Sequence, residues 1–236
     1  MTTYTSTTNP VRSDLNPVPI TPATSRSRSW ALAGIGAGLA GIGTIVASGM
    51  VNAVYDADLA GDTPAIADKL ADQTAPMFAF HTFALVGAVL TVVFAAGLYR
   101  RLRARLGDAS TAPLVAFAGL VGTAVVSVLG SGLDTEFMLA LGEKDQIDPA
   151  NAALYNHWIG TIPWCWVLAG LAGLAVFVAS RAGGAPRWIG YVGLVLGGLT
   201  LLLGISPLQY MAGMTGPLWL LVTAVGFTAG DRAFRR

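Results

Sequence analysis

The sequence has very little charge. Only 11% of its 236 residues are Asp, Glu, Lys or Arg, and the formal net charge is +1 at pH 7. Soluble globular domains usually carry about 25% charged residues, so this composition excludes an ordinary soluble protein. It also leaves no basic surface large enough to indicate nucleic-acid binding, and no nucleic-acid partner is expected.

Cysteine is almost absent as well. The single cysteine, Cys165, cannot form an intrachain disulfide. One thiol also excludes a zinc or iron–sulfur site built from several cysteines of one chain. A metal site in this chain would therefore depend on carboxylates and on its two histidines, His81 and His157.

Long apolar runs dominate the rest of the chain. Hydrophobic residues make up 54% of it, and the mean hydropathy is +0.62. A helix needs about 20 apolar residues to cross the hydrocarbon core of a bilayer. Stretches without Asp, Glu, Lys or Arg reach that length at 29–55, 73–99, 109–133, 149–180 and 188–230. The last contains "SPLQYMAGMTGP", whose prolines and glycines favour a turn, so it predicts two helices.

The sequence therefore predicts an all-α fold, a polytopic transmembrane bundle of six helices. The expected helices within the transmembrane domain, 30–231, are 30–54, 76–99, 112–135, 156–180, 187–206 and 216–230. Residues 1–29 are rich in Ser, Thr and Pro and predict a disordered cytoplasmic tail, and 232–236 predict a basic cytoplasmic end. Between the first two spans, "DTPAIADKLADQTAP" predicts a short amphipathic surface helix.

Charged residues are divided unevenly between the predicted loops. Twelve of the 14 basic residues precede the first span, follow the second, flank the loop after the fourth or end the chain. Lys69 and Lys144 lie in the other loops, together with ten of the 13 acids. Because basic loops are retained on the cytoplasmic side, both termini are predicted to be cytoplasmic.

Polar side chains recur toward the acidic end of the third predicted helix. Thr123, Ser127, Ser131 and Asp134 follow at spacings of four, four and three, which places them on one helical face. Hydroxyls in membrane helices commonly bond the carbonyl one turn back, so a structural role is the expected one for these three. Asp134 ends the polar face with a carboxylate.

His81 lies in the apolar stretch "MFAFHTFALV", roughly 7 to 8 Å inside the predicted outer end of its helix. An ionisable residue at that depth is costly unless it faces protein or a cavity. A neutral His81 that is hydrogen-bonded to Asp134 or Asn52 would satisfy this requirement. A ligand or proton site would satisfy it equally, and both interpretations stay open at this point.

Three functions are compatible with this layout. The first is binding or transport of a small ion or amphipathic molecule through an outward-facing polar pocket lined by Asn52, His81, Ser131, Asp134 and His157. The second is a metal- or haem-dependent membrane enzyme or redox protein, with His81, Asp134 and His157 as metal ligands. No spacing such as H-E-x-x-H accompanies these histidines. The third is an accessory structural membrane subunit.

Glycines at close spacing indicate where helices touch. They include Gly34 and Gly38 in the first predicted helix and Gly170 and Gly173 in the fourth. Small residues let helix backbones approach closely, most often inside one bundle and sometimes between subunits. We therefore expect the lipid bilayer as a partner. The alternative use of the Gly-rich helix faces is contact with a second copy of the chain, in a homo-oligomer, or with another membrane protein.

The C-terminal half, with "PRWIG" at the start of the fifth span, and "HTFALVGAVL" in the second span resemble uncharacterised six-helix bacterial integral membrane proteins, a domain-of-unknown-function family. The resemblance covers about 30–231. It implies the six-helix fold and a bacterial inner-membrane location. It implies no established activity and no catalytic residue.

Overall fold

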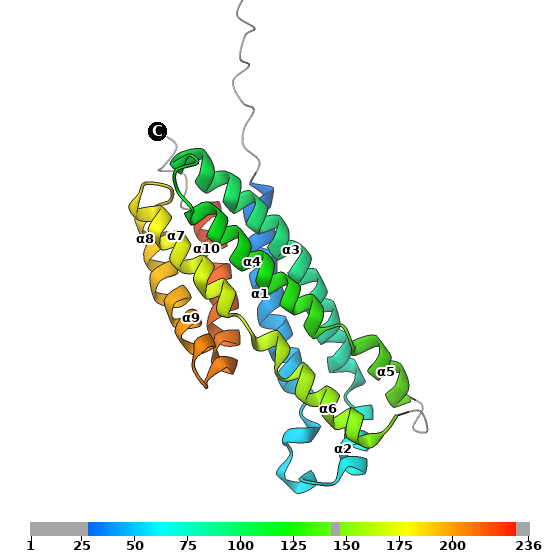
Figure 1. Cartoon of the computed structure of the whole chain (residues 1–236). Coiled ribbons are helices and arrows are strands. Elements are labelled where there is room, and N and C mark those ends of the chain that lie inside the picture. Colours follow the sequence, from blue (N-terminus) through cyan, green and yellow to red (C-terminus); the bar gives the residue numbers. More distant parts are fainter. Residues whose placement is uncertain (1–27, 143–146, 230–236) are drawn as a thin grey trace, which may run out of the picture.

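The structure is a computed structural model that describes residues 28–142 and 147–229, and all regular elements in these ranges are helical (Figure 1). Six segments are long and apolar enough to cross a membrane: Ser29–Met50, Thr74–Leu106, Ala112–Gly142, Pro149–Arg181, Arg187–Ile205 and Gln209–Ala229. The prediction of an all-α bundle with six membrane helices is confirmed. The predicted tail, except its last two residues, and the basic end lie outside the described residues.

Three spans consist mainly of one helix each: α1 (Ser29–Met50), α3 (Thr74–Leu106) and α10 (Ala212–Ala229). The third span is divided into α4 (Ala112–Gly130) and α5 (Asp134–Gly142), and the fourth into α6 (Pro149–Ile159) and α7 (Val167–Arg181). The fifth consists of α8 (Arg187–Val192), the π-helical turn η5 (Gly193–Gly197) and α9 (Gly198–Ile205). Short elements complete the chain: η1 (Ala53–Tyr55), η2 (Ala57–Leu59), α2 (Thr63–Ala71), η4 (Ile162–Trp164) and η6 (Gln209–Met211).

Two predicted helices differ from the structure because they are interrupted. The predicted helix 112–135 ends at Gly130, and a turn separates it from α5. The predicted helix 156–180 starts earlier, at Pro149, and is broken between α6 and α7. Pro163 lies in this second break, where it has no N–H to donate to a helical carbonyl. Both interruptions therefore lie at glycine or proline positions.

The membrane bundle has one apolar core. α1 packs against α3 and α10, α3 packs against α4, and α4 packs against α7, which also contacts η5 and α9. Large buried side chains of this core are Phe94, Leu98, Leu102, Leu120 and Trp219. The order of contacts places α1 between α3 and α10, and the N-terminal and C-terminal halves meet where α1 packs against α10 and where α4 packs against α7.

Backbones come very close where α7 meets the fifth span. A methyl group built at Gly173 would lie 2.7 Å from the Cα of Gly197, and one built at Gly170 would lie 2.7 Å from the carbonyl oxygen of Gly197. These glycines therefore serve packing inside the bundle. Packing inside one bundle is the more common of the two roles that the sequence predicts for these glycines.

A second apolar core lies at one end of the bundle. It joins α2, α5, α6 and η1 around buried residues such as Ile66, Leu70, Met138 and Tyr155. Figure 1 shows these elements extending beyond the turn between α9 and α10. We call this part of the molecule, the described residues 51–73, 134–142 and 147–159, the cap.

The predicted amphipathic surface helix is α2. Asp62 begins it by accepting a hydrogen bond from the backbone N–H of Ala65, and Pro64 lies in the first turn, where a missing N–H costs nothing. Ile66 and Leu70 are buried because they face α6 and the cap core. The prediction of a short helix with one apolar face is confirmed.

Both described ends of the chain lie at the end of the bundle opposite the cap (Figure 1). The Arg28 guanidinium donates to the carbonyl of Thr228 over 3.1 Å, which links the start of α1 to the end of α10. Arg101 donates to the carbonyl of Gly184 over 3.2 Å at the same end. The described arginines at the start of α1, at the end of α3 and beside the loop between α7 and α8 therefore gather there, as the uneven division of charge predicted. The assignment of that end to the cytoplasm stays a prediction.

An ion pair on the cap surface yields a prediction about pH. The ammonium of Lys69 lies 2.6 Å from Asp56 Oδ2, and this hydrogen bond, with a second one from the Asp58 backbone N–H, lowers the pKa of Asp56. A lowered folded-state pKa stabilises the protein above about pH 4, and this contribution is lost as the pH falls through the folded value. Lys69→Ala should raise the Asp56 pKa in an NMR titration and reduce the stability difference between pH 6 and pH 3, whereas Lys69→Arg should change both less. An unchanged Asp56 pKa in Lys69→Ala would contradict the pairing.

Candidate functional site

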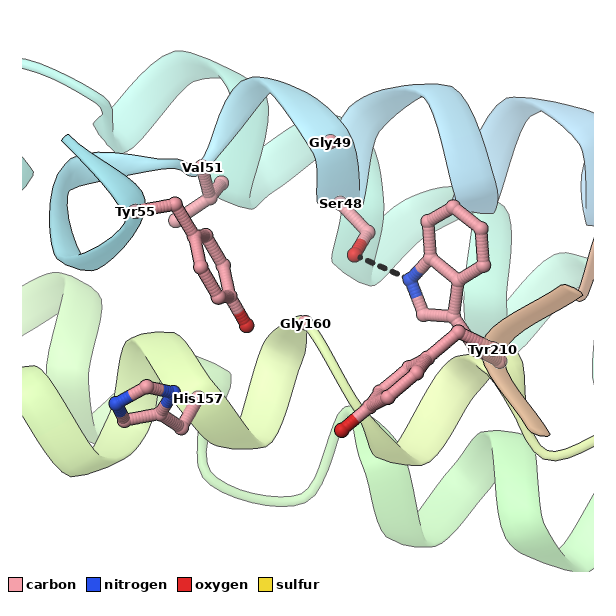
Figure 2. A pocket seen from close by; sticks show the side chains of 8 residues that line it. Ser48, Gly49, Val51, Tyr55, His157, Gly160 and Tyr210 are labelled. Atoms are coloured by element: carbon pink, nitrogen blue, oxygen red, sulfur yellow. Dashed lines mark hydrogen bonds between the residues drawn. The ribbon is translucent and has the colours of Figure 1, made fainter. Parts of the chain in front are cut away.

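A cavity of about 480 Å³ opens where α1 ends, between the cap and the turn before α10 (Figure 2). It is lined by Ser48, Gly49, Val51, Tyr55, His157, Gly160, Trp164 and Tyr210. Small-molecule sites usually measure about 300 to 1,000 Å³, so the volume suits a ligand of moderate size. The lining comes from three separate parts of the chain, 48–55, 157–164 and Tyr210, which meet only in the folded bundle.

Asn156 positions the cavity wall that follows α1. Its buried side chain donates to the carbonyl of Val51 over 2.7 Å and accepts from the N–H of Val54 over 2.8 Å. One amide thus satisfies two backbone groups that the end of α1 leaves free. The chain turns into η1 as a result, and Tyr55 is directed back toward α6.

The break between α6 and α7 forms the opposite wall. Trp164 donates its indole N–H to Ser48 Oγ over 3.0 Å, and Ser48 Oγ donates to the carbonyl of Ile159 over 2.7 Å (Figure 2). Trp158 and Trp166 brace the same segment through the carbonyls of Gly130 and Pro163, each over 3.0 Å. The irregular backbone between the two helices is therefore fixed in place.

Two phenols and an imidazole project into the cavity. Tyr55 meets His157 edge to face, with ring centroids 5.7 Å apart. In Figure 2, Tyr55 and Tyr210 extend toward the segment around Gly160 from opposite sides. A methyl group at Gly160 would collide with the Tyr55 hydroxyl, so glycine is needed for this approach. All three side chains are exposed, Tyr55 by 57% and Tyr210 by 46%.

The lining is mainly apolar, with a few polar groups. No Asp, Glu, Lys or Arg of the described residues lines the cavity. Partial burial, and secondarily the neighbouring Tyr210, raise the pKa of Tyr55, so its phenol keeps its proton at neutral pH. The cavity therefore offers a ligand aromatic surface and groups that can donate or accept hydrogen bonds.

A second polar cluster joins α3, α5 and α6. Asp134 is fully buried, with a side-chain exposure of 0%, and its two carboxylate oxygens have different partners. His81 Nδ1 lies 3.1 Å from Oδ2, and the Tyr155 hydroxyl donates to Oδ1 over 3.0 Å. The predicted bond between His81 and Asp134 is present, so a buried carboxylate and an intramembrane histidine satisfy one another.

The five residues predicted to line one pocket do not all meet. His81 and Asp134 form the pair just described, whereas only His157 lines the cavity. Asn52 is bonded to Gln73 through two hydrogen bonds, of 2.9 and 3.0 Å. Ser131 Oγ donates to the carbonyl of Val128, 3.1 Å away. His81 with Asp134 and Asn52 with Gln73 thus form two separate pairs, and the cavity is lined by His157 together with residues that were not predicted.

The proposed metal ligands are divided in the same way. His81 and Asp134 lie together, while His157 contacts Tyr55. Among residues 28–142 and 147–229, no three His, Cys, Asp or Glu side chains are close enough together to hold a metal ion. The described residues therefore provide no geometry that favours the metal-dependent interpretation.

Comparisons with other proteins add no relative: no family model, no curated protein and no solved structure matches the chain. The site must be interpreted from its own chemistry. Sequence reasoning missed Tyr55, Trp164 and Tyr210 as lining residues. A signal was present for Trp164 and Tyr210, because both lie where glycine or proline interrupts an apolar run, in "GTIPW" and "SPLQYM".

Proposed function

We propose that this multi-pass membrane protein binds a membrane-borne amphipathic small molecule in the cavity between α1, the break after α6 and the turn before α10. The observation that carries the proposal is a cavity of about 480 Å³ whose described lining combines the aromatic rings of Tyr55 and Tyr210 and the imidazole of His157 with no Asp, Glu, Lys or Arg. An amphipathic molecule needs such a polar site for its head group beside an apolar path for its tail.

The position of the cavity relative to the bilayer supports this proposal. The fifth span, Arg187–Ile205, has 19 residues, about the length that crosses a bilayer core. The turn that follows it carries Tyr210 and therefore lies near a membrane surface. Met50, Leu208 and Met211 are exposed apolar residues on the same level of the molecule. A head group in the cavity would thus leave its tail beside the lipid.

The irregular backbone between α6 and α7 is a second support. Non-helical backbone at membrane depth is tolerated where it is buried in protein or lines a cavity. Here the segment does line the cavity, through Gly160 and Trp164. We further propose that the arginine-rich end faces the cytoplasm of a bacterial cell and that the cavity opens in the outer half of the inner membrane.

A bare ion fits the cavity less well than an amphipathic molecule. Ion sites in membranes are usually built from charged side chains or from several converging carbonyl oxygens. The described cavity wall has no charged side chain. Of the two ligand classes predicted from the sequence, the amphipathic molecule is therefore the one we propose.

Gly49 allows a direct test of binding. It lies on the cavity wall in α1, and a side chain built there would meet nothing within 4 Å. Gly49→Leu should therefore add bulk at the edge of the cavity without disturbing the fold. A photoreactive hexadecanol that carries a diazirine, added to purified protein in nanodiscs, should label peptides containing Trp164 and Tyr210, and Gly49→Leu should reduce this labelling several-fold.

Gly142→Leu is the matched control. Gly142 is also an exposed helical glycine with nothing within 4 Å of a built side chain, but it lies at the end of α5 and does not line the cavity. Its labelling pattern should equal that of the wild type. Labelling spread evenly over all lipid-facing peptides, and unchanged in Gly49→Leu, would contradict the proposal.

A further inference from the structure

We propose that the membrane bundle contains a buried water site where α10 faces α7 and the fifth span. The site is formed by the indole N–H of Trp219, the hydroxyl of Thr223 and the carbonyl oxygen of Gly193. None of these residues lines the cavity at the end of α1, so the site does not depend on the function proposed for that cavity.

Trp219 and Thr223 carry buried polar atoms without a partner. Both residues have an exposed fraction of 0%, yet neither Trp219 Nε1 nor Thr223 Oγ1 is hydrogen-bonded to any of the described residues. They lie one turn apart on the same helix, α10. An unpaired buried polar group is costly, and buried polar side chains in native proteins nearly always bond to protein or to ordered water.

Other buried indoles and hydroxyls show how such groups are usually satisfied. Trp166, which is also buried, donates its indole N–H to the carbonyl of Pro163 over 3.0 Å. Thr123 donates to the carbonyl four residues earlier over 3.0 Å. Thr223 could make the same local bond within α10, but its hydroxyl does not make it. We therefore expect the Thr223 hydroxyl to have a partner outside its own helix.

Both side chains lie on the face of α10 that packs against the fifth span. Residues three, four and seven apart share one face of a helix, which groups Trp219 and Thr223 with Gly226. A methyl group built at Gly226 would lie 3.1 Å from the Ile189 side chain of α8. Thr223 thus lies between a contact with α8 and the indole of Trp219.

A hydrogen-bond donor and an acceptor meet beside Gly173 of α7. A methyl group built at Gly173 would lie 3.0 Å from Trp219 Nε1 and 3.1 Å from the carbonyl oxygen of Gly193, the first residue of η5. The indole has no direct bond to that oxygen. A bridging water can join two groups that are about 5 to 6 Å apart, and a carbonyl oxygen can accept a second bond.

The chemistry of these groups selects water as the ligand. An indole N–H only donates and a carbonyl oxygen only accepts, whereas the hydroxyl of Thr223 does either. A cation would be repelled by the N–H and an anion by the carbonyl, but a water molecule donates and accepts. Space is limited as well, because a methyl at Gly173 would lie only 2.7 Å from the Cα of Gly197. Buried waters typically make about three hydrogen bonds, the number offered here.

Water-edited NMR measures this contact directly. The protein is labelled at its tryptophan indole nitrogens and studied in nanodiscs, and the Trp219 signal is identified by its loss in Trp219→Phe. This signal should gain magnetisation from water. The buried indole of Trp166 is the matched control, because its N–H is bonded to protein, and its transfer should be several-fold weaker. Transfer to Trp219 that is no stronger than transfer to Trp166 would overturn the proposal.

Thr223→Val keeps the shape of the side chain and removes the hydroxyl. Transfer from water to the Trp219 indole should then fall several-fold, because the water loses one of three partners. Thr223→Ser keeps the hydroxyl and should retain the transfer. Thr123→Val, which removes a local bond in α4, should leave it unchanged. Transfer to Trp219 that Thr223→Val leaves intact would overturn the proposed site.

The melting temperature of Thr223→Val gives a second readout with opposite signs for the two possibilities. A hydroxyl that is bonded to water contributes to stability, so the melting temperature should fall. An unpaired buried hydroxyl is unfavourable, so its replacement by a methyl would raise the melting temperature. A rise would therefore contradict the water site.

Discussion

Gly170→Ala is expected to lower the free energy of unfolding by about 1 to 3 kcal/mol, a typical cost of overpacking a well-packed interior. The added methyl would lie 2.7 Å from the carbonyl oxygen of Gly197 and 2.8 Å from the Cα of Leu201. Both are backbone atoms of the fifth span, so no side chain can rotate away. This steric clash could be relieved only if α7 moved away from η5 and α9.

Gly198→Ala is the matched control for this contact. Gly198 begins α9 on the facing segment, and a methyl there would meet only the flexible end of Leu174, at 3.6 Å. Its effect should lie within about 0.5 kcal/mol of zero. Both variants can be compared by equilibrium unfolding in mixed micelles. Equal losses for the two would show that the close approach of α7 to the fifth span is wrong.

His81→Phe is expected to destabilise the protein by about 1 to 3 kcal/mol, the cost of leaving a buried polar group short of a hydrogen-bond partner. Asp134 is fully buried, so the carboxylate would keep only its bond to Tyr155. The His81 side chain is 29% exposed, which means that solvent or lipid head groups soften the loss somewhat. The lower end of the range is therefore expected, measured by the same unfolding experiment.

A double-mutant cycle distinguishes this pairing from a simple packing loss. His81→Phe combined with Asp134→Asn should be more stable than the sum of the two single effects predicts, because the amide needs no imidazole partner. Tyr155→Phe should cost about 1 to 3 kcal/mol, the penalty for leaving a buried group short of one hydrogen bond. Strict additivity of His81→Phe and Asp134→Asn would contradict a direct bond between the two side chains.

The spans could be predicted from the sequence because lipid imposes a simple rule. Every backbone polar group in the hydrocarbon core must be satisfied within the chain, so charge-free runs of sufficient length become helices. The cap helix α2 was also predictable, since Asp62 and Pro64 signal its start and apolar residues recur on one face. Local rules of this kind depend on residues close together in sequence.

The cavity could not be predicted because it depends on where helices stop. The expected polar face of the third helix assumed that Asp134 continues the helix of Thr123, whereas α4 ends at Gly130. Thr123 Oγ1 instead donates to the carbonyl of Gly119 over 3.0 Å, the local bond typical of membrane hydroxyls. His81 is hydrogen-bonded to Asp134 as expected, since both belong to apolar segments that offer few other polar partners.

The lining residues also come together from distant parts of the chain. Tyr55 and His157 are about a hundred positions apart, and their contact depends on the two hydrogen bonds that Asn156 makes to the chain after α1. A buried asparagine in a predicted helix carries no signal of which distant backbone it will bind. Tertiary contacts of this kind need the folded bundle to become visible.

The central claim is that the cavity beside Tyr55, Tyr210 and His157 holds an amphipathic molecule. The most direct test is an experimental density map of the protein purified from native membranes into lipid nanodiscs, compared with Gly49→Leu prepared in the same way. The account predicts elongated density in the wild type, with its polar end within hydrogen-bonding distance of the two phenols, and none in Gly49→Leu. Separate water peaks in both maps, with the cavity otherwise empty, would contradict it.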